Sequence, residues 1–455
     1  MIVDSGHQRM RDWRRWLACA WAVLAIGSVA GPSLSAQEII AFRQATVETM
    51  GPAGRLERAT IVVENGRIHS VGIEIPIPDR ARIIDLAGKT VIPGIVDPYF
   101  VVDFPLGAEP TEEVRTITVR GRGFQVPQAA GSPAVFVKIA DVFDSRRGDW
   151  NTAIRSGITT SQVVTRGYGQ SVFANPWPTS KQDSAARHVG GKHPMIVEPA
   201  GRLFTAVTND SSSLRTIREG LAEPRATGQG GARRGAPGGR GAGSGEEGST
   251  PPSNNQGGTP SPGGEAAPAA SPSQDLWRAI RSGQHPLFVN ANNAAAILYV
   301  LAELEKTPSV QTAAVASGGD WYLALPALEN RKVTAILPPR LDTEPRNQNR
   351  VNVPKMLHEA GIEFAFSLST GQSEYRSTQP NPLFPVAMLV KSGLPRTTAL
   401  EALTIRPARL LGLGDQVGSI EPGKRADLVV FDADPLDATA EVVQVWIGGQ
   451  LLHGE

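Results

Sequence analysis

The stretch Val91-Ile-Pro-Gly-Ile-Val-Asp-Pro-Tyr-Phe-Val101 decides the fold of this chain of 455 residues. A short apolar run enters a Pro-Gly turn, and a second apolar run follows and reaches an acid. Short, continuous apolar runs are typical of buried parallel strands, and α/β barrels carry their chemistry at the carboxyl ends of such strands. We therefore expect Asp97, Tyr99 and Val101 to face a site at the end of a barrel strand.

The residues before this stretch predict β structure. The run Ala-Thr-Ile-Val-Val at 59–63 leads into Glu-Asn-Gly at 64–66, a hairpin turn, and 67–72 is the returning strand. A further strand is expected at 81–86.

The C-terminal residues also predict β structure. Residues 417–432 read Val-Gly-Ser-Ile-Glu-Pro-Gly-Lys-Arg-Ala-Asp-Leu-Val-Val-Phe-Asp. The Pro-Gly pair supplies a tight turn, and an apolar strand follows Asp427. The final strand is expected at 442–452, with the glycine pair at 448–449 as its turn.

Strands alternate with helices between these two halves, which favours a parallel α/β sheet. The expected strands are 158–164, 195–199, 285–290, 312–316, 333–337 and 362–366, and the expected helices are 149–155, 294–306 and 397–411.

These segments together resemble the amidohydrolase superfamily, in particular its imidazolonepropionase-like branch. Pro93, Gly94 and Asp97 match the first-strand pattern Pro-Gly-x-x-Asp-x-His-x-His, and residues 399–408 are similar to the family's Ala-Leu-x-x-x-Thr-x-Asn-Pro-Ala helix. The resemblance implies an α/β fold with a TIM-like (β/α)8 barrel over 91–416. It also implies a small composite β-sandwich built from 37–90 and 417–455.

The resemblance further implies hydrolysis of non-peptide carbon–nitrogen bonds, such as those of cyclic amides, with one or two divalent metal ions. The family's metal-ligand and proton-accepting positions fall on Tyr99, Val101, Asn290 or Asn292, Ser317 and Ser369. None is a histidine or an aspartate, and neutral oxygen donors bind transition metals weakly. We therefore predict no metal cofactor, although zinc or another divalent metal serves the family. Glu198 lies near the mid-barrel acid position, but one carboxylate makes no zinc site.

Two readings of the function stay open. In the first, the protein hydrolyses carbon–nitrogen bonds as the family does, although the loss of the metal-ligand positions argues against catalysis. The other is a non-catalytic descendant that binds a small-molecule ligand or a partner protein at the barrel mouth. His188 and His193 are the one histidine pair that could rebuild a metal site; the alternative is that both are exposed loop residues. No Gly-x-Ser-x-Gly elbow or phosphate loop offers another chemistry.

The first 36 residues resemble a signal peptide: arginines at 11, 14 and 15 precede an apolar run at 16–30 and a cleavage site before Gln37. The expected location is therefore periplasmic or extracellular, with no stable membrane span after cleavage; an uncleaved anchor is the alternative. Cys19, the only cysteine, lies in this segment, so the mature chain has no disulfide.

Composition limits the remaining partners. With a net charge of +1, the chain has no overall positive potential that would attract nucleic acid, so no nucleic-acid partner is expected. Residues 226–274 consist almost wholly of small and polar residues, which predicts a disordered insertion. No oligomeric state follows from the sequence.

Overall fold

The structure is a computed structural model, and every structural statement below concerns the residues it describes. These are 38–102, 114–119, 122–127, 150–165, 175–183, 193–207, 217–222, 272–291, 293–316, 320–329, 331–344, 349–368 and 381–454. The predicted signal peptide and nearly all of the predicted insertion lie outside them. A helix that begins at Pro272 overlaps the end of the range predicted for the insertion.

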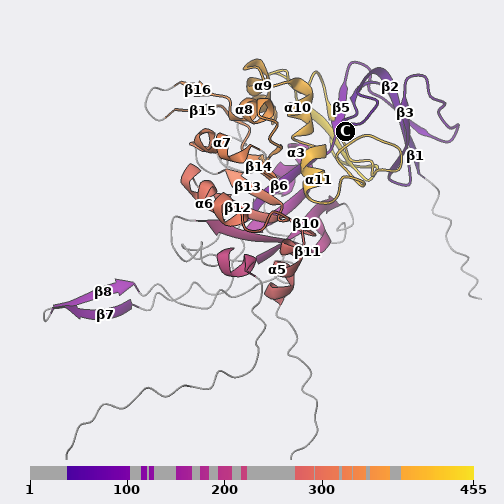
Figure 1. Ribbon diagram of the computed structural model, residues 1–455. Coiled ribbons are helices and arrows are strands. Elements are labelled where there is room, and N and C mark those ends of the chain that lie inside the picture. The colour runs from indigo at the N-terminus through magenta and orange to yellow at the C-terminus, as the bar shows by residue number, and fades with distance from the viewer. Residues whose placement is uncertain are drawn as a thin grey trace, which may run out of the picture.

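The two ends of the described chain build one mixed sheet of eight strands (Figure 1). Its order is β20-β19-β18-β5-β1-β2-β3, and β4 pairs with β1 alone. The strands are β1 (Ile39–Glu48), β2 (Arg55–Glu64), β3 (Arg67–Gly72), β4 (Arg82–Asp85), β5 (Thr90–Pro93), β18 (Leu428–Phe431), β19 (Val442–Ile447) and β20 (Gln450–His453). The central contact joins segments far apart in sequence, because β5 pairs antiparallel with β18.

This composite sheet bends over on itself. Register shifts interrupt the β1–β2 pair, and Gln44 and Arg58 have positive φ angles of 62° and 51° beside them. Bulges of this kind bend a strand and increase its twist. As a result, the β2–β3 turn meets the β19–β20 turn, where a Cβ added to Gly66 would lie 2.6 Å from the Gly448 carbonyl oxygen. The predicted sandwich is thus one continuous, curled sheet around its own apolar core.

The second sheet also has eight strands, in the order β17-β14-β13-β12-β11-β10-β9-β6. They are β6 (Ile95–Val102), β9 (Ile158–Thr165), β10 (Asn175–Asp183), β11 (His193–Val207), β12 (Leu287–Ala291), β13 (Thr312–Ala316), β14 (Val333–Leu337) and β17 (Phe364–Phe366). The prediction of a wholly parallel sheet is wrong at β10, which runs antiparallel to both neighbours. Its sequence, Asn-Pro-Trp-Pro-Thr-Ser-Lys-Gln-Asp, has no apolar run that would predict a strand.

Helices lie along this second sheet (Figure 1). They are α3 (Trp150–Arg155), α5 (Pro272–Arg281), α6 (Ala294–Leu304), η2 (Trp321–Ala324), α7 (Leu325–Leu328), α8 (Val353–Glu359), α9 (Phe384–Lys391), α10 (Arg396–Glu401) and α11 (Ile405–Leu410). Two short hairpins are separate from both sheets, β7 (Val114–Val119) with β8 (Arg122–Pro127) and β15 (Asp342–Thr343) with β16 (Arg350–Val351). In the part of the chain that is described, no helix is long and apolar enough to cross a membrane.

The single helix predicted at 397–411 is two short helices, and the break between them has a structural reason. The carbonyl oxygen of Ala402 accepts a hydrogen bond from the Phe366 amide at 2.8 Å, and that of Leu403 accepts one from the Val96 amide at 2.9 Å. These amides belong to β17 and β6, the two edge strands of the second sheet. The residues at the break in the helix are therefore hydrogen-bonded to both edge strands of the second sheet.

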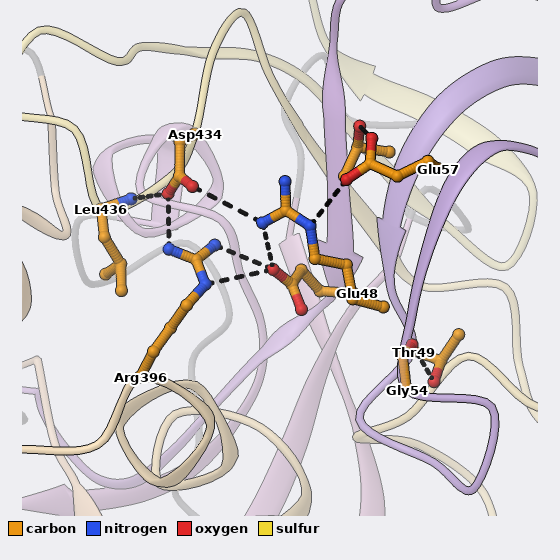
Figure 2. Close-up of polar contacts among 9 residues, drawn as sticks. Glu48, Thr49, Gly54, Glu57, Arg396, Asp434 and Leu436 are labelled. Atoms are coloured by element: carbon orange, nitrogen blue, oxygen red, sulfur yellow. Dashed lines mark hydrogen bonds and ion pairs between the residues drawn. The ribbon is translucent and has the colours of Figure 1, made fainter.

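A cluster of charged side chains joins the composite sheet to α10 (Figure 2). The Arg396 guanidinium lies 2.8 Å from Glu48 Oε1 and 2.8 Å from Asp434 Oδ1. Arg55 adds a contact of 3.1 Å to the same Glu48 oxygen. The side chain of Glu48 is only 7% exposed, so these contacts compensate a carboxylate that has lost most of its water.

Candidate functional site

The inner face of the second sheet is identified by the side chains of β6. Phe100 is buried and stacks on Trp150 of α3, with ring centroids 5.0 Å apart, so it points toward the helices. Tyr99 precedes it and therefore points to the opposite, inner face. Asp97 is 1% exposed, and its Oδ1 accepts a hydrogen bond of 2.9 Å from the Tyr99 amide. This bond holds the backbone that carries Tyr99.

Tyr99 meets Asn290 across the inner face. The amide nitrogen Nδ2 of Asn290 donates to the Tyr99 hydroxyl oxygen at 3.2 Å. Tyr99 lies on β6 and Asn290 on β12, and three strands separate them in the sheet. Ser367, just after β17, donates through its hydroxyl to the Tyr99 carbonyl oxygen at 3.1 Å. The sheet is therefore curved enough for three distant strands to meet at Tyr99.

Gln162 of β9 lies next to this pair. Asp97 is the register partner of Ser161 and Phe100 that of Val163, so Pro98 and Tyr99 together face Gln162. This is a bulge in β6, and it puts Gln162 on the inner face with Tyr99. The Gln162 side chain is 0% exposed, and neither its amide nitrogen nor its amide oxygen has a hydrogen-bond partner.

The described residues include only part of the predicted site. Asp97, Tyr99 and Asn290 are brought together as stated above. Val101 is described as backbone of β6, without its side chain. The remaining predicted positions, Asn292, Ser317, Ser369 and His188 together with the side chains of Glu198 and His193, lie outside the described residues.

Sequence reasoning missed Gln162 and Ser367. Gln162 is the one amide in the strand Ile158–Thr165, and the sequence does not show which face of the strand it occupies. The available signal was a polar side chain of this size inside a predicted strand. Ser367 gave no signal, because a serine that follows a strand is common in loops.

The donor atoms found here do not fit the divalent metal that the family uses. The family resemblance predicts metal ligands at Tyr99 and at Asn290 or Asn292, and Tyr99 and Asn290 present a neutral hydroxyl and a neutral amide that bond to each other. Zinc sites in proteins are built from histidine, cysteine and carboxylate ligands. Within the described ranges, no group of three such residues is placed to hold a metal ion.

A crevice lies at the same end of the sheet but on its outer face. Ala291, Ala316 and Leu337 end neighbouring strands and alternate with Asn290, so they point away from the inner face. Burial raises the pKa of Asp342 at its rim, although the charge and hydrogen bond of Arg340 at 3.0 Å oppose this. The crevice is lined by Ala316, Trp321, Leu337, Pro338, Arg340, Asp342, Val353 and Pro354.

Comparison with known families identifies the chain's relatives. A family model described as "Amidohydrolase family" matches residues 383–453, which span α9 to β20 and include the strands that complete the composite sheet. The C-terminal segment of the chain is therefore similar to the amidohydrolase superfamily. Its members thus share with this chain the C-terminal segment that also fastens the two sheets together.

Individual amidohydrolases match over short stretches. Amidohydrolase tasK of Hapsidospora irregularis is 51% identical over 57 residues, which are 12% of this chain and 6% of that protein. Imidazolonepropionase of Maricaulis maris is 42% identical over 62 residues, 14% of each chain. The chain thus spans only a small part of the length of these curated relatives. Among solved structures, an amidohydrolase from Thermotoga maritima aligns with a TM-score of 0.64 and 20% identity, over 91% of this chain and 100% of that one, which shows a shared fold.

Proposed function

We propose that this amidohydrolase-superfamily protein binds an amide-type small molecule on the inner face of its second sheet. We further propose that it does not hydrolyse carbon–nitrogen bonds through the family's metal centre. The observation that carries the proposal is the hydrogen bond between Asn290 and Tyr99, since the family resemblance predicts metal ligands at Tyr99 and at Asn290 or Asn292. Neutral hydroxyl and amide groups are suited to hydrogen bonds with an uncharged polar ligand.

We infer that the second sheet closes into a TIM-like barrel around this site. Three contacts support closure: the Tyr99–Asn290 bond across the inner face, the Ser367–Tyr99 bond, and the segment 402–403 that bonds to both edge strands. The ligand would then enter at the carboxyl ends of the strands, where barrels carry their sites.

The test is metal content together with turnover. Protein grown with added zinc and dialysed should retain far less than about one metal ion per chain. When the protein is tested on a panel of lactams and cyclic ureides, it should show no metal-dependent turnover, that is, no turnover that a chelator abolishes. About one zinc per chain, with turnover that a chelator removes and zinc restores, would sink the proposal.

A second candidate is hydrolysis of carbon–nitrogen bonds at a rebuilt metal site. The similarity to an imidazolonepropionase favours it, and His188 and His193 are the residues that would supply ligands. Replacing both histidines by alanine should then remove bound metal and turnover together. Metal content that does not change in this double variant would exclude these two ligands.

We also propose export, on the strength of the N-terminal signal-peptide pattern. Fractionation of a cell that expresses the full chain should recover the protein outside the cytoplasm, shortened before Gln37. Recovery in the cytoplasm with the first 36 residues retained would contradict this.

A further inference from the structure

We propose that α6 is the centre of an interface between two copies of this chain, in which the two α6 helices pack antiparallel about a two-fold axis. The inference does not depend on the proposed function, because it concerns the outer side of the second sheet. It follows from the side chains that α6 presents to solvent.

The exposed side of α6 is apolar. From Ala294 to Ala302 the helix reads Ala-Ala-Ala-Ile-Leu-Tyr-Val-Leu-Ala, without a charged residue. A helix that is apolar on one side only has polar residues facing solvent, whereas one that is apolar all round is normally buried. The exposed residues within this stretch are Ala295, Leu298, Tyr299 and Ala302. The exposed fraction is 41% for Leu298 and 40% for Tyr299, so α6 leaves large apolar side chains in water.

The spacing of these four residues favours a second copy as the partner. They stand at positions i, i+3, i+4 and i+7, which lie in one stripe along a helix. The order small, large, large, small is the same in both directions. In an antiparallel two-fold pair, Leu298 therefore packs on Tyr299 of the second copy, and Ala295 on Ala302 of the second copy. Alanine at both ends of the stripe lets two helix backbones approach closely, which suits a helix as the occupant.

The surroundings of the stripe have the composition of an interface. Leu323 of η2, which packs against α6, is 60% exposed and extends the apolar surface. Both elements lie on the side of the second sheet away from the composite sheet (Figure 1). Polar contacts lie around the stripe: Arg218 donates to the Tyr299 hydroxyl at 3.2 Å, and Arg331 lies 2.6 Å from Glu305. An apolar centre with a polar rim is the usual anatomy of a protein interface.

The first test is the oligomeric state of the purified full chain, measured by sedimentation over a range of concentrations. The chain should sediment as a dimer. Leu298→Glu should raise the dissociation constant at least about a hundredfold, because each copy then brings an unpaired carboxylate to the centre of the interface. The variant should keep the circular-dichroism spectrum of the natural chain, since Leu298 faces solvent within one copy.

Ile83→Glu is the matched control. Ile83 is 53% exposed, but it belongs to β4 of the composite sheet. The substitution should leave the dissociation constant of the dimer unchanged.

The second test reads the direction of the helices by cross-linking. Cys19 is the only cysteine, so Cys19→Ser gives a background in which Ala295→Cys and Ala302→Cys can be made one at a time. A mixture of the two variants should be joined by a short thiol-specific cross-linker. Neither variant should be joined to itself, because equal positions of antiparallel helices lie seven residues apart here, about 10 Å along the axis.

Two results would overturn the interface itself: a monomer at about 100 μM chain, or a dimer that Leu298→Glu does not weaken. Cross-linking of each single variant to itself, but not of the mixture, would contradict the antiparallel arrangement. None of these results bears on metal content or turnover, which decide the proposed function separately.

Discussion

The two polar clusters of this molecule are built in opposite ways. Between the composite sheet and α10, Glu48, Arg396 and Asp434 are charged, and every one of them has partners of opposite sign within 3.1 Å. On the inner face of the second sheet, Tyr99, Asn290 and Gln162 are neutral, and Gln162 has no partner. The first arrangement is typical of a group that stabilises the fold, and the second leaves hydrogen-bonding capacity for another molecule. Substitutions in each cluster should separate these roles.

The largest expected effect on stability is that of Arg396→Ala. It removes the guanidinium from Glu48, whose side chain is 7% exposed, and from Asp434. Breaking a pair that leaves a buried charge behind costs several kcal/mol, and because Arg55 still contacts Glu48 we expect a loss of about 2–4 kcal/mol in the free energy of unfolding.

Urea unfolding measures this loss, and Arg331→Ala is its control. That substitution breaks the pair with Glu305, in which both side chains are more than a third exposed, and should cost less than about 1 kcal/mol. Equal losses in the two variants would show that the cluster does not fasten α10.

The next effect is a dependence of this cluster on pH. Burial alone raises the pKa of Asp434, but hydrogen bonds from Arg396 and the Leu436 amide, with the charges of Arg396 and Arg55, outweigh it and lower the pKa below its ordinary 3.8. Since the pKa is lower in the folded state, the stabilisation is complete above 3.8 and is lost as the pH falls through the lowered pKa. Asp434→Asn should therefore be less stable than the natural chain at neutral pH.

Unfolding curves recorded from about pH 7 down to about pH 2 check the sign, because the two proteins should converge at the acid end. A difference in stability that is the same at every pH would mean that the charge of Asp434 contributes nothing.

The smallest effect concerns the neutral pair. Tyr99→Phe and Asn290→Ala each remove one side of a single hydrogen bond between partly exposed groups. A double-mutant cycle on the free energy of unfolding should give a coupling of about 1 kcal/mol. A coupling of zero would indicate that the two side chains do not bond in solution, and it would remove the observation on which the proposed function rests.

The sequence predicts most of the strands because their apolar runs are short and bounded by turn residues. Thr312–Ala316 and Val333–Leu337 have the bounds expected from the sequence alone. The helix break at 402–404 could not be predicted, since it depends on hydrogen bonds to strands far away in sequence. Local propensity there favours one continuous helix, and tertiary contacts override it.

The candidate site is predicted less completely than the fold. The family pattern leads to Asp97, Tyr99 and Asn290, which the structure brings near one another. It does not lead to Gln162, because a bulge in β6 decides which residues share its face, and bulges depend on the pairing of strands. For the same reason the curl of the composite sheet, with its bulges at Gln44 and Arg58, has no clear sign in the sequence.

The pairing of β5 with β18 also has a consequence for the order of events during synthesis. Val91 of β5 pairs with Val430 of β18, which is made about 340 residues later, so β5 lacks this neighbouring strand until then. At roughly 5–20 residues per second, a ribosome needs about 20–70 seconds to make that stretch. During this time β5 exposes an apolar edge that invites aggregation. The newborn chain should therefore depend on chaperones until its last strands have been made.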